Sequence, residues 1–322
     1  MKKIAVMTSG GDSPGMNAAI RAVVRGGLEY GIEVYGIRQG YTGLLGGDFM
    51  LLGSREVSGI VQRGGTILQT ARNLEFKTPQ GQKKGLRRLN ERGIEGLVVI
   101  GGDGSLHGAL ALHKLNFPVV GIPASIDNDI AGTSMSIGVD TALNTIIEAL
   151  DRIRDTASSH SRAFLIEVMG RSCGYLALVS SILGGAEVVS TPDHEVPIEK
   201  IAATLEDAYV RGKSHAIAII AEGVSYEMND VVTALRDNPQ VGFDVRVSIL
   251  GHIQRGGNPS AFDRFLASRM GVHAIEVLHE GRSGLMVRLD GQEMGTCPIE
   301  EALENNRPIG ESTYELARIL SQ

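Results

Sequence analysis

The feature that most constrains this sequence is a repeated order of apolar run, glycine-rich turn and amphipathic stretch. Short apolar runs bounded by glycines are typical of buried strands, and apolar residues that recur every three or four positions predict helices. We expect strands at 3–8, 33–37, 96–100, 117–122, 163–169, 215–221 and 245–250. We expect helices at 17–30, 105–114, 139–154 and 261–280, and a further one that begins at Tyr175. About ten such alternations predict an α/β protein with mainly parallel sheets, and 322 residues suffice for two domains of this kind.

The composition argues against several classes of partner. The 31 basic and 37 acidic residues give a net charge of −6, aromatic residues make up only 4%, and tryptophan is absent, so we expect no nucleic-acid partner. No apolar run reaches the length of a membrane span, and the chain begins without a cationic leader, so we expect no membrane partner. Cys173 and Cys297 show neither a disulfide framework nor a zinc spacing. We therefore expect a soluble protein of a reducing compartment, the cytoplasm.

Two aspartates stand directly after the expected strand at 117–122. Asp127 and Asp129 lie where catalytic loops gather in open α/β sheets, at the carboxyl end of a strand. One carboxylate can accept a proton while the other faces a metal-bound phosphate. The alternative is a plain turn, because Asp and Asn side chains often bond to their own backbone.

Two other segments predict phosphate binding. Residues 9–17 lie between an expected strand and an expected helix, an arrangement that offers free backbone N–H groups to a phosphate. The segment lacks the lysine of a P-loop, and a plain strand–helix turn is the alternative. Arg72 stands on a glycine-flanked loop and is a candidate phosphate clamp, because its planar fork matches phosphate oxygens.

The turn at 101–105 has two interpretations. Gly102, Gly104 and Gly108 match a dinucleotide fingerprint, which would indicate a Rossmann oxidoreductase. Asp103 argues against that interpretation, because a carboxylate between those glycines repels a pyrophosphate unless a divalent cation lies between them. We therefore favour a magnesium–nucleotide complex over NAD.

The segment 170–174 supports a rival hypothesis. It is a Gly-x-Ser-x-Gly pentad between an expected strand and an expected helix, the pattern of a serine hydrolase with Ser172 as nucleophile. No His-Gly-Gly oxyanion motif precedes it, and Arg171 suits phosphate chemistry better than acyl transfer. Further along the chain, His252 and Arg255 stand beside glycines and indicate an anion site. Residues 211–215 contain Gly-Lys-Ser without the rest of a Walker motif.

Five motifs taken together, in their order and spacing, resemble the bacterial ATP-dependent 6-phosphofructokinases. They are Ser9-Gly-Gly-Asp-Ser-Pro-Gly-Met-Asn17, Gly101-Gly-Asp-Gly104, Ile126-Asp-Asn-Asp129, Met169-Gly-Arg171 and Gly251-His-Ile-Gln-Arg-Gly-Gly257. The likeness covers essentially the whole chain and thins after about residue 284. It implies a glycolytic kinase that transfers the γ-phosphoryl of ATP to the 1-hydroxyl of fructose 6-phosphate, with Mg²⁺ as cofactor. It also implies two similar three-layer α/β domains with the active site in the cleft between them. Residues 1–138 plus about 252–305 would bind ATP, and residues 139–251 plus about 306–322 would bind fructose 6-phosphate.

The resemblance also implies roles for individual residues, with Asp127 as the general base and Asp103 at the Mg²⁺ ion. The implied catalytic set is Asp127, Arg171, Ser125, Asp129, Arg72 and Gly11. The implied ATP-binding set is Gly11, Tyr41, Arg72, Asn73, Gly102, Asp103, Gly104, Ser105 and Gly108. The implied sugar-phosphate set is Ser125, Ile126, Asp127, Arg162, Met169, Gly170, Arg171, Glu222, Arg246, His252, Ile253, Gln254 and Arg255. In the family, Arg162 and Arg246 come from a neighbouring subunit of a homotetramer.

The family has a second site between subunits, for an activating ADP or GDP or for inhibitory phosphoenolpyruvate. Its residues correspond to Arg21, Arg25, Arg154, Gly185, Ala186, Glu187, Arg211, Lys213, Ser214 and His215. Ser54 and Gly59 depart from the family pattern, so we expect weaker or altered allostery. Pyrophosphate-using relatives tend to carry Asp and Lys where this chain has Gly104 and Ala124, so ATP is favoured over pyrophosphate as donor.

Overall fold

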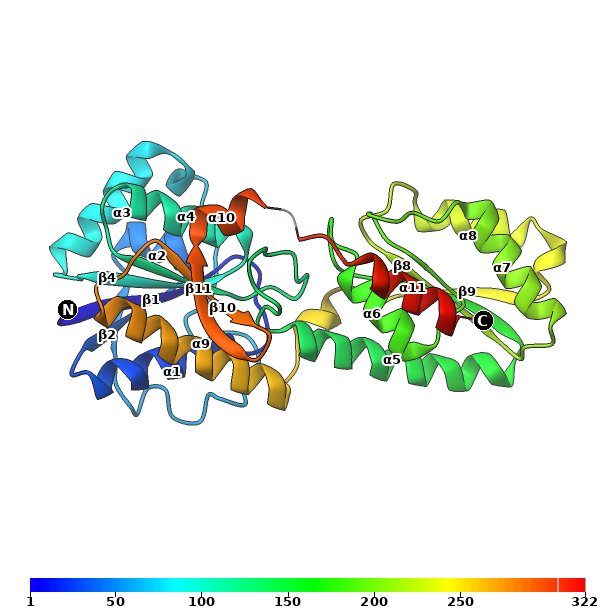
Figure 1. Cartoon of the computed structure of the whole chain (residues 1–322), viewed down its shortest axis with the longest axis horizontal. Helices are drawn as coiled ribbons and strands as arrows, with labels where there is room; N and C mark the ends of the chain where they lie inside the picture. The colour runs from blue at the N-terminus through cyan, green and yellow to red at the C-terminus, as the bar shows by residue number, and fades with distance from the viewer. Residues whose placement is uncertain (306, 322) are drawn as a thin grey trace. The chain divides into compact units, whose positions relative to one another are not determined.

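A seven-stranded sheet is built around β1 (Lys3–Ser9) in the computed structural model, which describes residues 1–305 and 307–321 (Figure 1). The strand order is β11–β10–β5–β4–β1–β2–β3. The other strands are β2 (Glu33–Ile37), β3 (Phe49–Leu52), β4 (Gly96–Gly101), β5 (Val119–Pro123), β10 (Leu285–Asp290) and β11 (Glu293–Pro298). The inner pairs are parallel, whereas the edge pairs β2–β3 and β10–β11 are antiparallel.

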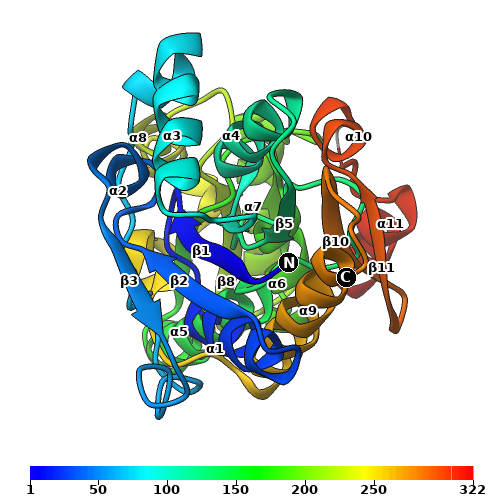
Figure 2. The same cartoon turned by 90° about the vertical axis from the view of Figure 1, so that its left-hand side faces the viewer.

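Helices cover both faces of this sheet, because its strands carry apolar side chains on both. In β1, Ile4 and Val6 belong to one buried cluster, and Ala5 and Met7 belong to the other. On the first face α1 packs against α9, and on the second lie α2, α3, α4 and α10 (Figure 2). These helices are α1 (Met16–Glu29), α2 (Gly40–Gly46), α3 (Pro79–Glu91), α4 (Asp103–Lys114), α9 (Ala261–His279) and α10 (Ile299–Glu304), with a short 3₁₀ helix η1 (Glu75–Lys77).

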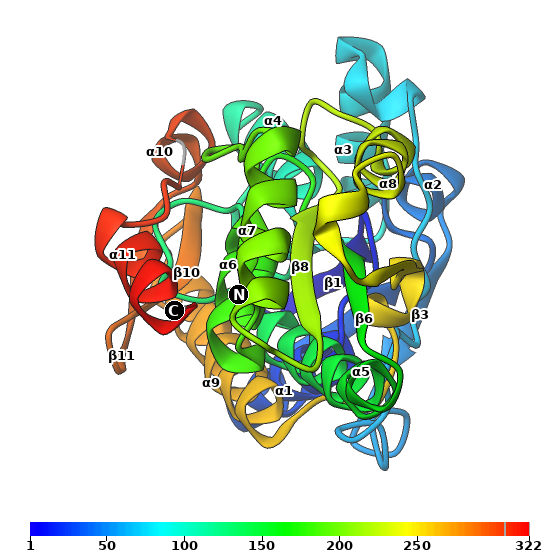
Figure 3. The same cartoon turned by 90° about the vertical axis from the view of Figure 1, so that its right-hand side faces the viewer.

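A second sheet has four parallel strands in the order β7–β8–β6–β9. Its strands are β6 (Arg162–Val168), β7 (Val188–Ser190), β8 (Ala216–Ala221) and β9 (Asp244–Ile249). The helices α7 and α8 cover one face, and α5 and α6 lie on the other (Figure 1, and from the side in Figure 3). The helices around this sheet are α5 (Val139–Ser159), α6 (Tyr175–Gly184), α7 (Ile198–Val210), α8 (Met228–Arg236) and α11 (Glu311–Leu320), with 3₁₀ helices η2 (Pro239–Val241) and η3 (Gly251–Arg255).

The chain divides into two compact units, each built on one of the sheets. Unit 1 is Met1–Ile126, Ile130–Thr141 and Arg255–Arg307, and unit 2 is Asp127–Asp129, Ala142–Gln254 and Pro308–Gln322. Residues 306 and 322, which belong to the expected segment 306–322, lie outside the described residues. Among the described helices, none is both long and apolar enough to cross a membrane.

The predicted fold class is confirmed, since both sheets are mainly or wholly parallel and are flanked by helices. Local differences have physical causes. α4 begins at Asp103 rather than Ser105, because the carbonyl of Gly102 accepts hydrogen bonds from the amides of Ser105 and Leu106. α5 continues to Ser159, five residues beyond the expected end at Arg154. The strands β3, β7, β10 and β11 are short or lie at or near sheet edges, where the apolar signal is weak.

Candidate active site

The strand order of unit 1 brings two glycine-rich turns together. β2 lies on one side of β1 and β4 on the other, so the order of strands reverses between β1 and β4. Open α/β sheets bind their ligands at such a switch point. Ser9 pairs with Gly101 at the carboxyl ends of the two strands. The two turns predicted to bind phosphate therefore start from neighbouring positions in the sheet.

The first turn of α4 has the polar lining that a phosphate needs. Gly102 is the N-cap and supplies no side chain to the helix end, so no capping side chain competes with a ligand for the N–H groups of the first turn. The Oγ of Ser105 is buried and has no hydrogen-bond partner among the described residues. A Cβ at Gly101 would lie 2.6 Å from that oxygen, so the glycine leaves room for the hydroxyl. A ligand oxygen at this helix end would satisfy a hydroxyl that is otherwise left without a partner.

Asp103 stands in the same turn and is suited to a magnesium ion that arrives with phosphates. Its side chain is 55% exposed, and its Oδ2 lies 3.4 Å from Nδ1 of His107. Within residues 1–305 and 307–321, no three His, Cys, Asp or Glu side chains gather as a metal-binding group. Mg²⁺ commonly uses one or two protein carboxylates, several waters and the phosphates of its substrate. One exposed carboxylate at a helix end therefore fits magnesium–nucleotide binding better than a resident metal centre.

Tyr41 packs against the first turns of α4. Its hydroxyl donates a 2.7 Å hydrogen bond to the carbonyl of Ser105, and its ring stacks on Phe76 with centroids 4.1 Å apart. A Cβ at Gly108 would lie 2.4 Å from the ring, so the ring and the helix backbone are in direct contact. Burial raises the pKa of Tyr41, so the hydroxyl stays protonated as a donor. Tyr41 thus positions Ser105. Nearby in the chain, Nδ2 of Asn73 donates a 3.2 Å hydrogen bond to Oγ1 of Thr42.

Arg255 lies against the first glycine turn. Its Nη1 is 2.9 Å from the point where a Cβ at Gly11 would lie, and it donates to the carbonyl of Asp12 at 3.5 Å. Two residues further on, the carbonyl oxygen of Gly257 is 2.1 Å from the point where a Cβ at Gly64 would lie. Gly11 and Arg255 were predicted to face different ligands, and unit 1 places them side by side.

Asn17 organises the neighbouring loop, a role that sequence reasoning did not assign. Its Nδ2 donates to the carbonyls of Arg63 and Gly64 at 3.1 Å each, and its Oδ1 accepts from the amide of Ile67 at 2.8 Å. The side chain is buried. The signal in the sequence was a polar residue on the apolar face of the first expected helix.

In unit 2, Asp127 meets Arg171. Oδ2 of Asp127 lies 3.5 Å from Nε of Arg171, the aspartate side chain is 2% exposed, and the arginine side chain is 56% exposed. Arg171 has φ of +50°, which is uncommon for a residue with a side chain. Its backbone amide donates to Oε1 of Glu222 at 3.0 Å, which holds the turn after β6 next to the end of β8. Arg171 and Glu222 thus stand at the carboxyl ends of the neighbouring strands β6 and β8, and Asp127 is in contact with Arg171.

Gln254 connects the loops that follow β6 and β9. Its Oε1 accepts from the amide of Met169 at 3.2 Å, and its Nε2 donates to the carbonyl of Gly251 at 2.9 Å. Gln254 is fully buried, whereas His252 and Ile253 are exposed. Its side chain therefore fixes the loop, and His252 is left facing solvent at the end of β9.

Arg162 lies at the other end of β6, and Arg246 lies midway along the neighbouring strand β9, in register with Phe164. Both contact one carboxylate, Asp244, at 3.3 Å and 2.7 Å respectively. Arg162 is the first residue of β6, and Met169 follows its last residue, so the rise of a strand separates the two by roughly 20 Å. Within one chain, Arg162 therefore cannot share a small ligand with Arg171.

Comparison with known proteins decides the family. A sequence model described as phosphofructokinase matches residues 3–278. This chain belongs to the phosphofructokinase family. It is 51% identical to the ATP-dependent 6-phosphofructokinase of Thermotoga neapolitana over 322 residues, and 51% identical to that of Shouchella clausii over 323 residues, with each match covering all of both chains.

Solved structures agree with this membership. Phosphofructokinase from Saccharomyces cerevisiae aligns over all of this chain and 48% of the yeast chain, with 36% identity and a TM-score of 0.89. A pyrophosphate-dependent phosphofructokinase from Marinobacter aquaeolei covers 97% of this chain and 86% of its own, with a TM-score of 0.84. Its identity of 21% shows a shared fold alone.

Several of the predicted effector residues lie together in unit 2. Lys213 lies 3.3 Å from Oε1 of Glu187, and the other oxygen of Glu187 accepts a 2.6 Å bond from the amide of Ile217. A Cβ at Gly185 would lie 3.7 Å from Nη2 of Arg154. Burial is the main factor that lowers the pKa of His215; Arg154 and Lys213 lower it further, and Glu187 opposes them.

The remaining effector residues are less tightly grouped. Arg211, which caps the C-terminal end of α7, forms an ion pair with Asp207 of that helix at 2.8 Å. The Oγ of Ser214 lies 3.1 Å from Nδ1 of His215. Ala186 is buried directly after α6. Arg21 and Arg25 lie on α1 in unit 1.

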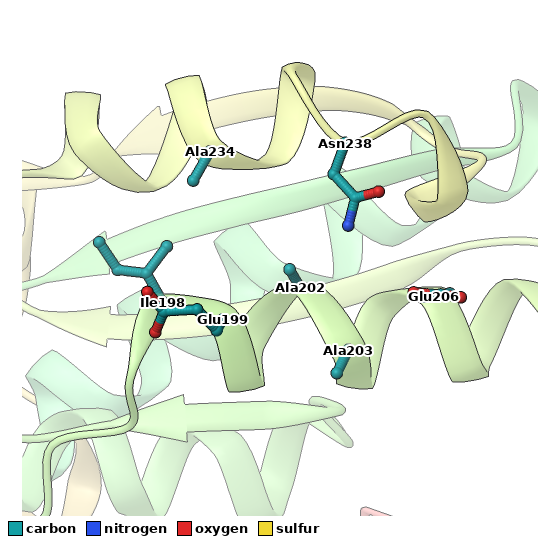
Figure 4. A pocket seen from close by; sticks show the side chains of 7 residues that line it. All are labelled: Ile198, Glu199, Ala202, Ala203, Glu206, Ala234 and Asn238. Carbon is teal, nitrogen blue, oxygen red and sulfur yellow. The ribbon is translucent and has the colours of Figure 1, made fainter.

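A groove between α7 and α8 is separate from all predicted residues. It has a volume of about 250 Å³ and is shown in Figure 4. Its lining consists of Ile198, Glu199, Ala202, Ala203, Glu206, Ala234 and Asn238. The lining has two acidic side chains and no basic one, which is unsuited to a sugar phosphate or a nucleotide.

Proposed function

We propose that this protein transfers the γ-phosphoryl of ATP to the 1-hydroxyl of fructose 6-phosphate and forms fructose 1,6-bisphosphate. The observation that carries the proposal is the pairing of Asp127 with Arg171 at the end of β6. A shielded carboxylate next to a solvent-facing guanidinium supplies a proton acceptor and a cation at one point. Phosphoryl transfer needs these two elements, because it depends on positioning and on charge stabilisation more than on covalent chemistry.

Unit 1 is proposed to bind ATP with its magnesium ion. The turns after β1 and β4 would hold the phosphates, with the Oγ of Ser105 and the N–H groups of α4 as donors. Asp103 would face the Mg²⁺ ion, which neutralises phosphate charge when it is bound. Arg72 is exposed on the loop before η1 and would reach the nucleotide from there. Gly104 favours ATP over pyrophosphate, as does the name of the relatives at 51% identity.

Unit 2 is proposed to bind fructose 6-phosphate. Asp127 would accept the proton of the 1-hydroxyl, a role worth about 10²–10⁴-fold in rate. Arg171 would stabilise the charge on the migrating phosphoryl group, and Asp129 would support the same loop. Met169, Gly170 and Glu222 would contact the sugar, and His252 would bind its 6-phosphate.

We further propose that the sugar-phosphate site is completed by a second copy of the chain. Arg162 lies roughly 20 Å from the Arg171 end of the sheet, and Arg246 shares its partner Asp244, so both would serve the site of a neighbouring subunit. A homotetramer would provide this exchange in a symmetric way. The cluster around Glu187 and Lys213 would then bind ADP, GDP or phosphoenolpyruvate, with altered response because of Ser54 and Gly59. The two buried free cysteines support a cytoplasmic location.

A coupled assay with fructose 6-phosphate tests this function. ATP with Mg²⁺ and, separately, pyrophosphate with Mg²⁺ are offered as donors, and fructose 1,6-bisphosphate is measured. We expect turnover with ATP and at least a hundredfold less with pyrophosphate. Efficient turnover with pyrophosphate would contradict the donor, and no turnover with either would contradict the reaction. A fluorophosphonate probe is the second measurement, because labelling of Ser172 would favour hydrolase chemistry instead.

A further inference from the structure

The C-terminal helix α11 is bonded to the loop that follows β7. The hydroxyl of Tyr314 lies 2.9 Å from Oγ1 of Thr191, and the ring of Tyr314 stacks on His194 with centroids 4.9 Å apart. Thr191 is fully buried, and its carbonyl accepts a 3.0 Å bond from the amide of His194. A hydrogen bond and a ring contact thus connect one residue of α11 to both ends of a tight turn.

That turn packs directly on the segment that carries Arg171. A Cβ at Gly174 would lie 2.3 Å from the Cβ of Thr191, so only a glycine allows the two backbones to approach this closely. A Cβ at Gly223 would lie 1.7 Å from the carbonyl oxygen of Arg171 and 2.9 Å from Cγ of Pro192. The Arg171 turn is therefore enclosed by the residues that follow β7 and β8.

The enclosure matters because Arg171 has a backbone conformation that it would not keep alone. Its φ is +50°, in the left-handed region, where a residue with a side chain persists only if its surroundings fix it. Glu222 fixes the amide of Arg171 from one side at 3.0 Å. Thr191 and Gly174 fix the far end of the same turn, where the carbonyl of Gly170 also accepts from the amide of Cys173 at 2.8 Å.

We propose that Tyr314 is a positioning residue for Arg171. Its hydroxyl holds Thr191 in place, Thr191 holds Gly174, and the turn between Gly170 and Gly174 then presents the Arg171 guanidinium to Asp127. This inference rests on the proposed role of Arg171 in phosphoryl transfer. It assigns a part in the reaction to a helix that lies beyond every motif in the sequence.

The variants Tyr314→Phe and Thr191→Val test the proposal, because each removes the same hydrogen bond from a different side. We expect each to lower kcat about three- to tenfold, the factor that one neutral hydrogen bond is worth, with the KM for ATP within about twofold. Thr191→Ser keeps the hydroxyl and is expected to retain most of the activity. Ile319→Ala is the matched control, since Ile319 lies on the same helix, is 51% exposed and has no part in the proposed chain of contacts.

A double-mutant cycle shows whether the effect passes through Arg171. In the Arg171→Ala background, Tyr314→Phe is expected to have no further effect on kcat, because the group that it positions is absent. The same fold loss in both backgrounds would overturn the proposal, and so would a Tyr314→Phe enzyme with unchanged kcat. A general loss of stability would lower the melting temperature and would not produce this dependence.

Limited trypsin digestion separates this inference from the proposed function. The bond between Arg171 and Ser172 is expected to be cleaved faster in Tyr314→Phe than in the unaltered chain, with the same rates at other sites. This readout does not require turnover. Unchanged cleavage at Arg171 overturns the positioning role, whereas an unaltered chain that fails to phosphorylate fructose 6-phosphate overturns the proposed function alone.

Discussion

Asp127 lies almost fully buried within 3.5 Å of Arg171, a side chain that is more than half exposed to solvent. The two groups differ in their surroundings as well as in charge. The carboxylate is buried in the loop that follows β5, and the guanidinium is exposed on the turn after β6. A sugar hydroxyl that binds in front of them would meet a proton acceptor and a cation together.

The backbone around Arg171 gives the first prediction. Gly223→Ala would place a methyl group 1.7 Å from the carbonyl oxygen of Arg171, so the turn must move. We expect a loss of stability of about 1–3 kcal/mol, the usual cost of overpacking, together with a fall in kcat. Urea unfolding and the coupled assay measure the two effects. Gly46→Ala is the control, because a Cβ at Gly46 meets nothing within 4 Å; equal effects of both substitutions would contradict the account.

The position of Arg162 gives the second prediction. Chains with Arg162→Ala and chains with His252→Ala are each expected to bind fructose 6-phosphate poorly. The two kinds of chain are unfolded together and refolded as a mixture, so that some neighbouring subunits carry different substitutions. Such a pair shares two sites. Both substitutions fall in one of these sites, so the other site is expected to be intact. Activity measured at low fructose 6-phosphate should therefore recover.

A chain that carries both substitutions is the control for this experiment, since no mixing with itself can restore a site. Absence of recovery in mixtures that form mixed oligomers would show that Arg162 serves its own chain or no site.

Asp103 gives the third prediction. Asp103→Asn removes the charge at the start of α4 without changing the shape of the side chain. We expect the concentration of free Mg²⁺ for half-maximal rate to rise about tenfold, which corresponds to a loss of about 1.4 kcal/mol in binding. Asp48→Asn, an exposed aspartate that pairs with Arg38, is the control. An identical magnesium dependence in all three proteins would exclude Asp103 from the ion.

Glu167 gives a prediction on pH. Burial, and then the nearby Glu222 and Glu227, raise the pKa of Glu167 in the folded chain above its ordinary value of 4.5. The carboxyl group of Glu167 therefore loses its proton at a higher pH in the folded state than in the unfolded state. As the pH rises from 4.5 through the pKa of the folded state, the free energy of unfolding falls. Glu167→Gln is expected to raise the melting temperature at pH 8, with a gain that shrinks toward pH 4. Glu293→Gln, at an exposed strand position, should show no such trend.

The fold class could be predicted because both sheets repeat one simple pattern. β4 and β6 are apolar on both faces, which is typical of strands covered by helices on each side, and the glycines after them mark the turns. β7 has three residues, and β10 and β11 form an antiparallel hairpin at a sheet edge. Such segments bury fewer apolar side chains, so their pattern resembles that of a loop.

Candidate site residues could be named from the sequence where chemistry requires particular residue types. Asp127 stands out as a carboxylate in the loop after an apolar strand, and Arg171 as an arginine in a glycine-rich turn. The contact of Tyr314 with Thr191 joins residues 123 positions apart, and no periodicity or motif reports it. Asn17 and Gln254 stand in motifs of the sequence, but the backbone groups that they bond are brought near them only by the folded chain.

The central claim is that Asp127 accepts the proton of the sugar hydroxyl, and Asp127→Asn tests it most directly. The amide keeps the shape of the side chain and cannot act as a base. In the coupled assay with ATP, Mg²⁺ and fructose 6-phosphate, the account predicts a kcat lower by about 10²–10⁴-fold with the KM values little changed. A kcat within tenfold of the unaltered enzyme would contradict it.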